Sequence, residues 1–196
     1  MRFLLSFVLV ALPLVAFAAT ETCGWEGTDT ILGQYGDIIA SIDTDPVYAG
    51  SQSLKLEDDM ASGTPQAFVG WVTGLDDGDT VAASFWRYDI TPSSAPSCRI
   101  WGHWNDDPGD INGYNGSASG QSEYGPGTGW DMAEFEWTVV DGHTGLVIEV
   151  RTYSSAGDIV WIDDLTVTAP DAATIIVPEE IVSLNRNTWA GIKAAF

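Results

Sequence analysis

Short runs of strand-forming residues, separated by turn-forming residues, restrict this chain to a fold made of β-strands. Helical periodicity is nearly absent before the C-terminal segment. Regularly spaced short strands with turn signals between them predict an all-β fold, either a sandwich or a barrel. The expected strands are rich in β-branched and aromatic residues and cover 37–42, 53–57, 66–72, 80–90, 97–104, 135–140, 145–154 and 159–167.

The two ends of the chain differ from this β-rich middle. Residues 1–19 have a positive start at Arg2, an apolar run and a small-residue end, which is the pattern of a secretory signal peptide. A membrane anchor is the alternative, but the run is short and small residues follow it. No later segment is long and apolar enough to span a bilayer. We therefore expect a secreted or cell-surface protein with one β-sandwich domain over 20–169 and a linker over 170–187.

The C-terminal residues 188–196 form a short amphipathic tail. Trp189, Ile192 and Phe196 are spaced by three and four residues, so a helix would place them on one face. The tail either folds back onto the sandwich or binds a partner at the cell surface. We favour the partner, because the tail lies beyond the last strand and follows a linker that gives it reach.

The charge of the chain excludes some classes of partner. There are 28 acidic residues and 7 lysines and arginines, which gives a formal net charge of −21. Such a surface repels nucleic acid and anionic lipid. It suits neutral ligands or cations.

The two cysteines of the chain are Cys23 and Cys98. An even pair in an exported protein predicts a disulfide, and closing so long a loop stabilises a fold by about 4 kcal/mol in the chain-entropy model. Two buried thiols are the alternative.

The last expected strand changes phase in its middle. Val160 and Ile162 are apolar and in phase, and so are Leu165 and Val167, but the second pair is one residue out of step with the first. A slip of this kind predicts a β-bulge at Asp163-Asp164. The bulge would either aim a carboxylate at a hard cation such as Ca²⁺ or leave both aspartates in water.

Several short motifs, taken in order, resemble the jelly-roll carbohydrate-binding modules of families four, nine and twenty-two. They are CGWEG (23–27), VYAGSQSLKL (47–56), GLDDGDTVAASFWRYD (74–89), GTGWDMAEFEW (127–137) and VWIDDLTV (160–167). The resemblance covers about residues 23–168. It implies a jelly-roll sandwich of two antiparallel sheets.

The resemblance also implies a structural calcium that ties the first strand to the last. Carboxylates would come from Glu26 and from Asp163 or Asp164. The carbonyl groups of Gly24, Tyr48 and Ser51 would complete the set of ligands.

In such modules the sugar lies across a concave sheet, on aromatic rings flanked by polar side chains. Strand alternation provides outward-facing residues of this kind, and a long Gly-rich loop over 105–130 adds aromatic residues that could wall a groove. Cross-strand pairs facing solvent are the alternative. The candidate ligand-binding residues are Trp86, Tyr88, Arg99, Trp101, His103, Tyr114, Tyr124, Glu149, Arg151 and Tyr153.

The expected partner is a neutral polysaccharide or a cell-surface glycan, and we expect no enzymatic activity. A closely spaced catalytic carboxylate pair on one strand is missing, which leaves Glu136 and Glu149 as a conceivable pair on neighbouring strands. The sequence thus predicts a secreted, non-catalytic carbohydrate-binding module. A structural or adhesive sandwich that binds no sugar is the other candidate.

Overall fold

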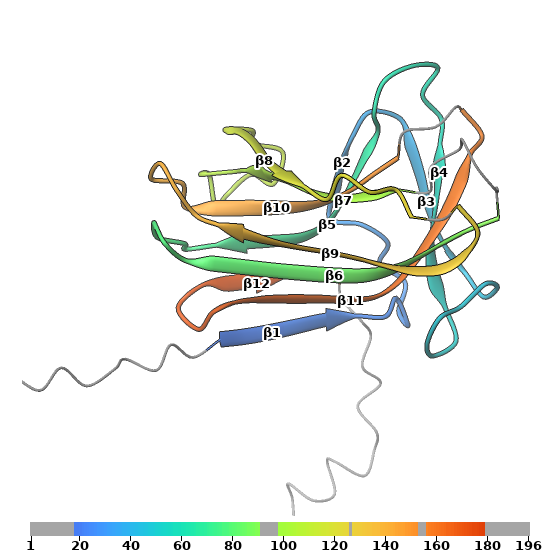
Figure 1. Cartoon of the computed structure of the whole chain (residues 1–196), viewed down its shortest axis with the longest axis horizontal. Coiled ribbons are helices and arrows are strands. Elements are labelled where there is room, and N and C mark those ends of the chain that lie inside the picture. The colour runs from blue at the N-terminus through green and yellow to red at the C-terminus, as the bar shows by residue number, and fades with distance from the viewer. Residues whose placement is uncertain (1–17, 91–97, 126, 153–155, 179–196) are drawn as a thin grey trace, which may run out of the picture.

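The computed structural model describes residues 18–90, 98–125, 127–152 and 156–178. These residues form two antiparallel sheets that face each other as a sandwich (Figure 1). The predicted all-β jelly-roll class is therefore confirmed. Within the described ranges there is no helix long and apolar enough to cross a membrane.

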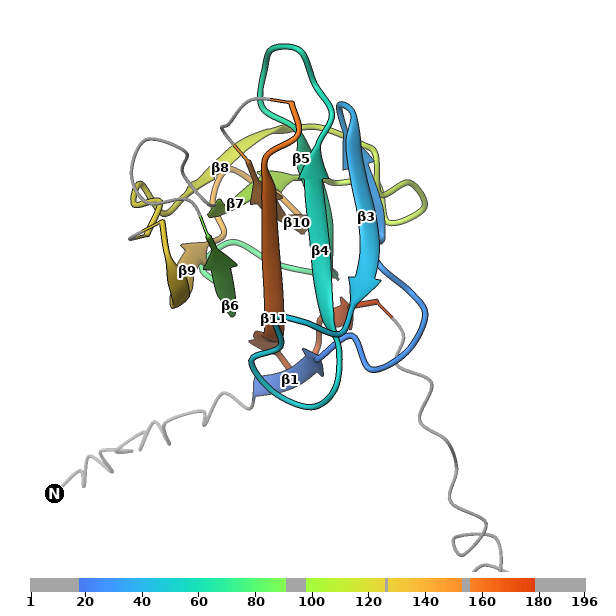
Figure 2. The same cartoon turned by 90° about the vertical axis from the view of Figure 1, so that its right-hand side faces the viewer.

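Each sheet combines strands that are far apart along the chain. Sheet A, part of which faces the viewer in Figure 2, has the order β3 (Ile38–Asp43), β4 (Ser53–Asp58), β11 (Ile159–Pro170), β6 (Thr80–Asp89) and β9 (Gly129–Thr138), with β1 (Ala18–Cys23) also paired to β11. Sheet B has the order β12 (Thr174–Ile176), β5 (Gln66–Thr73), β10 (Gly145–Arg151), β7 (Arg99–Trp104) and β8 (Gly116–Gly120), with β2 (Gly33–Tyr35) also paired to β5.

The core lies between the two sheets and follows from strand alternation. On β6, Val81, Ala83 and Phe85 point inward and are buried, while the residues between them are partly exposed. Strand β10 differs, because six of its seven residues are buried. Its outward side chains must therefore be covered from the solvent side of sheet B.

Four strands lie outside the eight expected ones. They are β1, β2, β8 and β12, and three of them have no more than five residues. Strand β8 forms inside the expected 105–130 loop. Strand β12 forms at the start of the expected 170–187 linker and pairs with β5, so the sandwich continues past residue 169. The tail over 188–196 lies outside the described residues.

The predicted β-bulge is present in β11. The register between β11 and β6 shifts between Asp163 and Thr166. Asp164 has a φ of 52°, in the left-handed region that few residues other than glycine adopt. The bulge also separates the two halves of the opposite edge of β11, which pairs with β4 over Ile159–Ile162 and with β1 from Leu165 onward.

The bulge places the carboxylate of Asp163 under a loop that precedes β4. Asp163 is fully buried, and its Oδ2 accepts hydrogen bonds from the backbone N–H groups of Tyr48 (2.9 Å) and Ala49 (3.0 Å). Its Oδ1 accepts the N–H of Asp164 at 2.8 Å. The phase slip thus aims one buried carboxylate at three amides, while Asp164 itself is exposed.

The predicted Cys23–Cys98 disulfide is not formed. Both cysteines are buried and no bond joins them. Cys23 ends β1 of sheet A and pairs with Leu165 on β11, whereas Cys98 directly precedes β7 of sheet B. Burial raises the pKa of the Cys98 thiol to about 12, so it stays protonated.

The two adjacent aspartates should contribute very differently to stability. Asp163→Asn places an amide group against N–H donors and should lower the free energy of unfolding by about 1–3 kcal/mol. Asp164→Asn, a matched change at an exposed left-handed position that asparagine tolerates, should cost less than about 0.5 kcal/mol. Urea denaturation of both variants measures the difference. Equal losses would contradict the role assigned to Asp163.

Candidate functional site

The predicted ligand-binding residues lie on two different faces of the molecule. Trp86 and Tyr88 are on the outer face of sheet A. A second group is on sheet B, so a single groove containing all of them is wrong. Strand alternation shows which side of its strand a residue occupies, but it does not show which sheet the strand joins. The sheet B group is Arg99, Trp101, His103, Glu149 and Arg151, and Tyr153 lies outside the described residues.

The aromatic residues of sheet A pack against one another. Tyr48 stacks on Trp86, with ring centroids 4.1 Å apart and planes 14° from parallel. Trp130 contacts both Tyr48 and Tyr88, and Tyr88 contacts Trp161 edge to face. Tyr48 thus covers one ring face of Trp86 and anchors the loop whose amides bind Asp163. This cluster holds the loop in place.

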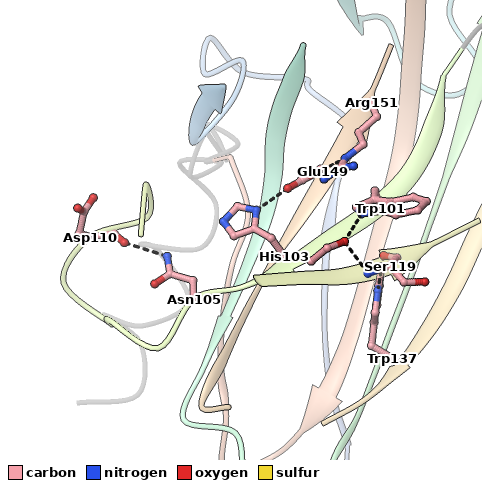
Figure 3. Close-up of polar contacts among 9 residues, drawn as sticks. Trp101, His103, Asn105, Asp110, Ser119, Trp137, Glu149 and Arg151 are labelled. Atoms are coloured by element: carbon pink, nitrogen blue, oxygen red, sulfur yellow. Dashed lines mark hydrogen bonds and ion pairs between the residues drawn. The ribbon is translucent and has the colours of Figure 1, made fainter. Parts of the chain in front are cut away.

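A buried carboxylate organises the outer face of sheet B (Figure 3). Glu149 on β10 is 0% exposed. Its Oε1 contacts His103 Nδ1, and its Oε2 accepts a hydrogen bond from Arg151 Nε at 2.5 Å. Because a carboxylate only accepts, His103 Nδ1 carries the proton of this contact. The alternation of β10 had predicted an exposed Glu149; its neighbours bury it instead.

Aromatic rings hold the arginines of this face. The guanidinium groups of Arg99 and Arg151 lie 5.0 Å and 4.7 Å from the ring centroid of Trp101. Arg99 also lies 4.5 Å from the ring of Tyr124. Trp101 is fixed in turn, because its indole N–H donates to Ser117 Oγ on β8 at 2.9 Å (Figure 3). Cation–π contacts of this kind hold the planar groups in defined positions.

A cleft of about 610 Å³ opens beside this cluster. Two strongly exposed tyrosines line it, Tyr35 from β2 (63% exposed) and Tyr114 from the loop after β7 (66% exposed). The other lining residues are Gln66, Phe68, His103, Asn112 and Arg151. Tyr114, His103 and Arg151 were predicted. Tyr35 and Asn112 were missed, since β2 is too short to give a periodic signal and the loop gives none. Gln66 and Phe68 were missed although they lie on the expected strand over 66–72, because the sequence does not show that this strand borders the cleft.

The loop that supplies Asn112 and Tyr114 is held by polar contacts at its base. The side-chain amide of Asn105, which is buried, donates to the carbonyl of Asp110 at 2.8 Å (Figure 3). The carboxylate of Asp106 accepts the N–H of Thr144 and lies 3.1 Å from His143 Nδ1. Tyr114 itself lies over His103, with ring centroids 5.5 Å apart. The expected functional loop therefore forms one wall of the cleft.

One buried polar atom among the described lining residues has no hydrogen-bond partner. His103 is 2% exposed, and its Nε2 has no hydrogen bond within the part of the chain that the structure describes. With a proton on Nδ1, Nε2 accepts a hydrogen bond in the neutral ring and donates one in the protonated ring. Buried polar atoms are normally satisfied, so an unpartnered one beside a cleft indicates a ligand group or water that completes it.

The residues predicted to bind calcium hold a loop through hydrogen bonds. Glu26 Oε1 accepts the N–H groups of Ser51 (2.7 Å) and Gln52 (3.2 Å), and its Oε2 accepts the Ser51 hydroxyl. Gly50 has a φ of 70°, and a Cβ there would lie 2.1 Å from Glu26 Oε1. The loop is therefore shaped around this carboxylate.

The pKa shifts agree with these contacts. The hydroxyl and amide of Ser51 lower the pKa of Glu26 below its usual value. Burial raises the pKa of Asp163, and the amides of Ala49, Asp164 and Tyr48 oppose that rise.

These contacts do not fit the predicted calcium site. A calcium ion requires six to eight oxygen ligands, whereas the oxygens of Glu26 and Asp163 face N–H and O–H donors. Within the described residues, no group of three or more His, Cys, Asp or Glu side chains could hold a metal. The calcium site stays a prediction, with Asp164, Gly24, Tyr48 and Ser51 as its remaining expected ligands, and the amide contacts count against it.

Comparisons with known proteins identify the fold. No protein-family model matches the sequence, and no curated protein matches it. The chain is similar to the N-terminal CBM22-1–CBM22-2 tandem domain of Xyn10C from Paenibacillus barcinonensis, with a TM-score of 0.54, 14% identity and coverage of 87% of this chain and 50% of that one.

A second solved structure is similar as well. It is the N-terminal CBM22-1–GH10 part of xylanase 10B from Clostridium thermocellum, complexed with xylohexaose. The TM-score is 0.50 at 12% identity, and the match covers 76% of this chain and 28% of that one. These likenesses show a shared fold, the jelly-roll sandwich of carbohydrate-binding modules, as the sequence motifs predicted.

Calcium should leave the stability of this protein unchanged. The carboxylates of Glu26 and Asp163 already accept backbone N–H groups, so an ion would have to displace those donors. We expect the same melting temperature in excess calcium and in excess EDTA, measured by circular dichroism on the full chain. A clearly higher melting temperature with calcium that Glu26→Gln abolishes would instead establish the metal site.

Proposed function

We propose that the protein is a secreted, non-catalytic carbohydrate-binding module whose cleft on the outer face of sheet B holds a polysaccharide chain. The observation that carries this proposal is the cleft itself, with two exposed tyrosines and the unpartnered Nε2 of His103 among its lining. Sugar rings combine flat C–H faces with hydroxyl groups, so they match a site of aromatic surfaces and a few fixed polar atoms.

The dimensions and chemistry of the cleft suit a sugar. Its volume of about 610 Å³ falls within the range of about 300–1,000 Å³ typical of small-molecule sites. Tyr35 and Tyr114 offer ring surfaces, while Gln66 and Asn112 offer both donors and acceptors. His103 Nε2 pairs with one hydroxyl, which can both donate and accept. Because Glu149 fixes both His103 and Arg151, these groups are ordered before a ligand arrives.

The outer face of sheet A is a poorer candidate. It carries a hollow of about 410 Å³ lined mainly by small and acidic residues, among them Ser84, Thr166, Glu134 and Glu136. Apart from Phe135 it contains no aromatic ring among its lining residues. The aromatic cluster near Trp86 lies elsewhere on this sheet and is occupied by its own packing.

The position of the carboxylates supports a non-catalytic role. Glu136 lies on β9 of sheet A and Glu149 on β10 of sheet B. The conceivable pair on neighbouring strands is therefore wrong, because the two residues belong to different sheets. Glu149 is also held by two partners in a fully buried position, where it offers no oxygen to a ligand.

The similar solved structures suggest which ligand to test first. The Clostridium thermocellum protein is complexed with xylohexaose, a β-linked pentose oligomer. A xylan-type polymer is thus the first choice, followed by β-glucans and mannans. A structural or adhesive role without sugar binding is the alternative that the same experiment tests.

Removing a wall of the cleft should weaken binding without unfolding the protein. Tyr114→Ala and Tyr35→Ala each delete an exposed ring, and each should lower the affinity for xylo-oligosaccharides about tenfold, as for a central contact residue. Ile39→Ala is the matched control, since Ile39 is 50% exposed on sheet A. Isothermal titration calorimetry measures all three.

The proposal fails if the unaltered chain binds no xylan, β-glucan or mannan in affinity electrophoresis. It also fails if both tyrosine variants bind as well as the Ile39→Ala control. The first result would favour the adhesive alternative.

A further inference from the structure

We infer that the cleft is selective for an acidic sugar, whose carboxylate lies against the guanidinium groups of Arg151 and Arg99; this inference rests on the proposed function. The ligand is then a largely neutral polysaccharide that carries isolated uronate groups. This changes the sequence-based expectation of a purely neutral polymer.

The first support is where the few cations of this acidic chain are placed. The described lysines and arginines are Lys55, Arg87, Arg99 and Arg151. Arg87 is 2% exposed and pairs with Asp131 at 2.8 Å, and Lys55 is on sheet A. The two remaining described cations both lie on the outer face of sheet B, where Arg151 lines the cleft and Arg99 contacts the same Trp101 ring as Arg151. In a protein with a net charge of −21, this face is where an anion meets positive charge.

The second support is the mutual arrangement of the two arginines. Arg151 and Arg99 are direct register partners on β10 and β7. Like charges directly opposite each other in a sheet destabilise it. Here both guanidinium groups are held against the ring of Trp101. An anion that reaches both guanidinium groups would relieve their repulsion.

The third support is that Arg151 has donors to spare. A guanidinium group has five N–H donors in a planar fork. Of these, Nε donates to Glu149, and Arg151 Nη1 and Nη2 make no hydrogen bond with any of the described residues. Arg151 lines the cleft and its side chain is 13% exposed. Its free edge is the group that binds a carboxylate with two parallel hydrogen bonds.

The negative charge of Glu149 does not cancel the attraction of the two arginines for a ligand carboxylate. It is buried and already accepts from both Arg151 and His103. The formal charges of Glu149, Arg151 and Arg99 add up to +1. A ligand carboxylate therefore meets a locally positive site, although the whole protein is negative.

The negative charge of the protein limits how many carboxylates a bound polysaccharide can carry. A net charge of −21 repels a dense polyanion at long range. Exposed charges are screened beyond about 8 Å at physiological ionic strength. A single carboxylate on a neutral chain therefore experiences mainly the local arginines, whereas a polymer charged at every ring is repelled.

Paired ligands test the inference directly. One is a xylan with hexuronate side groups, and the other is the same polymer after chemical reduction of its carboxyl groups to alcohols. We expect the native polymer to bind the full-length protein about tenfold more tightly, because hydrogen bonds to a charged partner are stronger than those to a neutral one. Isothermal titration calorimetry gives both affinities.

Matched variants locate the effect. Arg99→Gln should bind the native and the carboxyl-reduced polymer with nearly equal affinity. Lys55→Gln on sheet A should still bind the native polymer more tightly. If Arg99→Gln does not fold, Arg151→Lys is the test variant in its place. Lysine keeps a positive charge beside Glu149 but lacks the planar set of N–H donors that binds a carboxylate with two hydrogen bonds.

The outcomes separate the two proposals. Equal binding of both polymers overturns the acidic-sugar inference and leaves carbohydrate binding intact. Retention of the preference in the arginine variant also overturns the inference. Failure of both polymers to bind overturns carbohydrate binding, and the inference with it.

Discussion

The buried carboxylate of Glu149 is the constraint on which the outer face of sheet B depends. An ionised group without water is tolerated only when charged or hydrogen-bonding partners satisfy it. Here His103 and Arg151 do so from the same strand and its neighbour, and both are thereby fixed in orientation. Trp101, bonded to Ser117, then supports the arginines. Contacts with one buried carboxylate thus fix the orientation of the polar groups beside the cleft.

The two sheets divide structural and binding roles between them. On sheet A, the bulge at Asp163 and the stacked pair Tyr48–Trp86 hold the loop before β4. Glu26, in the segment that follows β1, holds the same loop. On sheet B, the exposed tyrosines at residues 35 and 114 remain uncovered beside the cleft. Aromatic residues abound on both faces, but only those of sheet B line a cleft with unpartnered polar atoms among the described residues.

Much of the fold could be predicted from the sequence, because it depends on local patterns. Eight strands, β3–β7 and β9–β11, follow from alternation and turn chemistry, and the phase slip between Ile162 and Leu165 predicted the bulge at the residue where the register shifts. Partners distant in the sequence could not be predicted this way. Asp163 finds its donors 114 and 115 residues away, and Cys23 and Cys98 adjoin strands of different sheets. The cleft was half predicted, since His103 and Arg151 follow alternation while Tyr35 depends on how the short β2 pairs.

The most direct test of this account is to map a bound xylo-oligosaccharide by nuclear magnetic resonance. The indole N–H signals of the tryptophans report both faces in one titration. The account predicts shifts for the Trp101 indole and for the imidazole of His103, with the Trp86, Trp130 and Trp161 indoles unchanged. Shifts confined to those three tryptophans of sheet A would contradict it, because they would place the sugar on the opposite face of the sandwich.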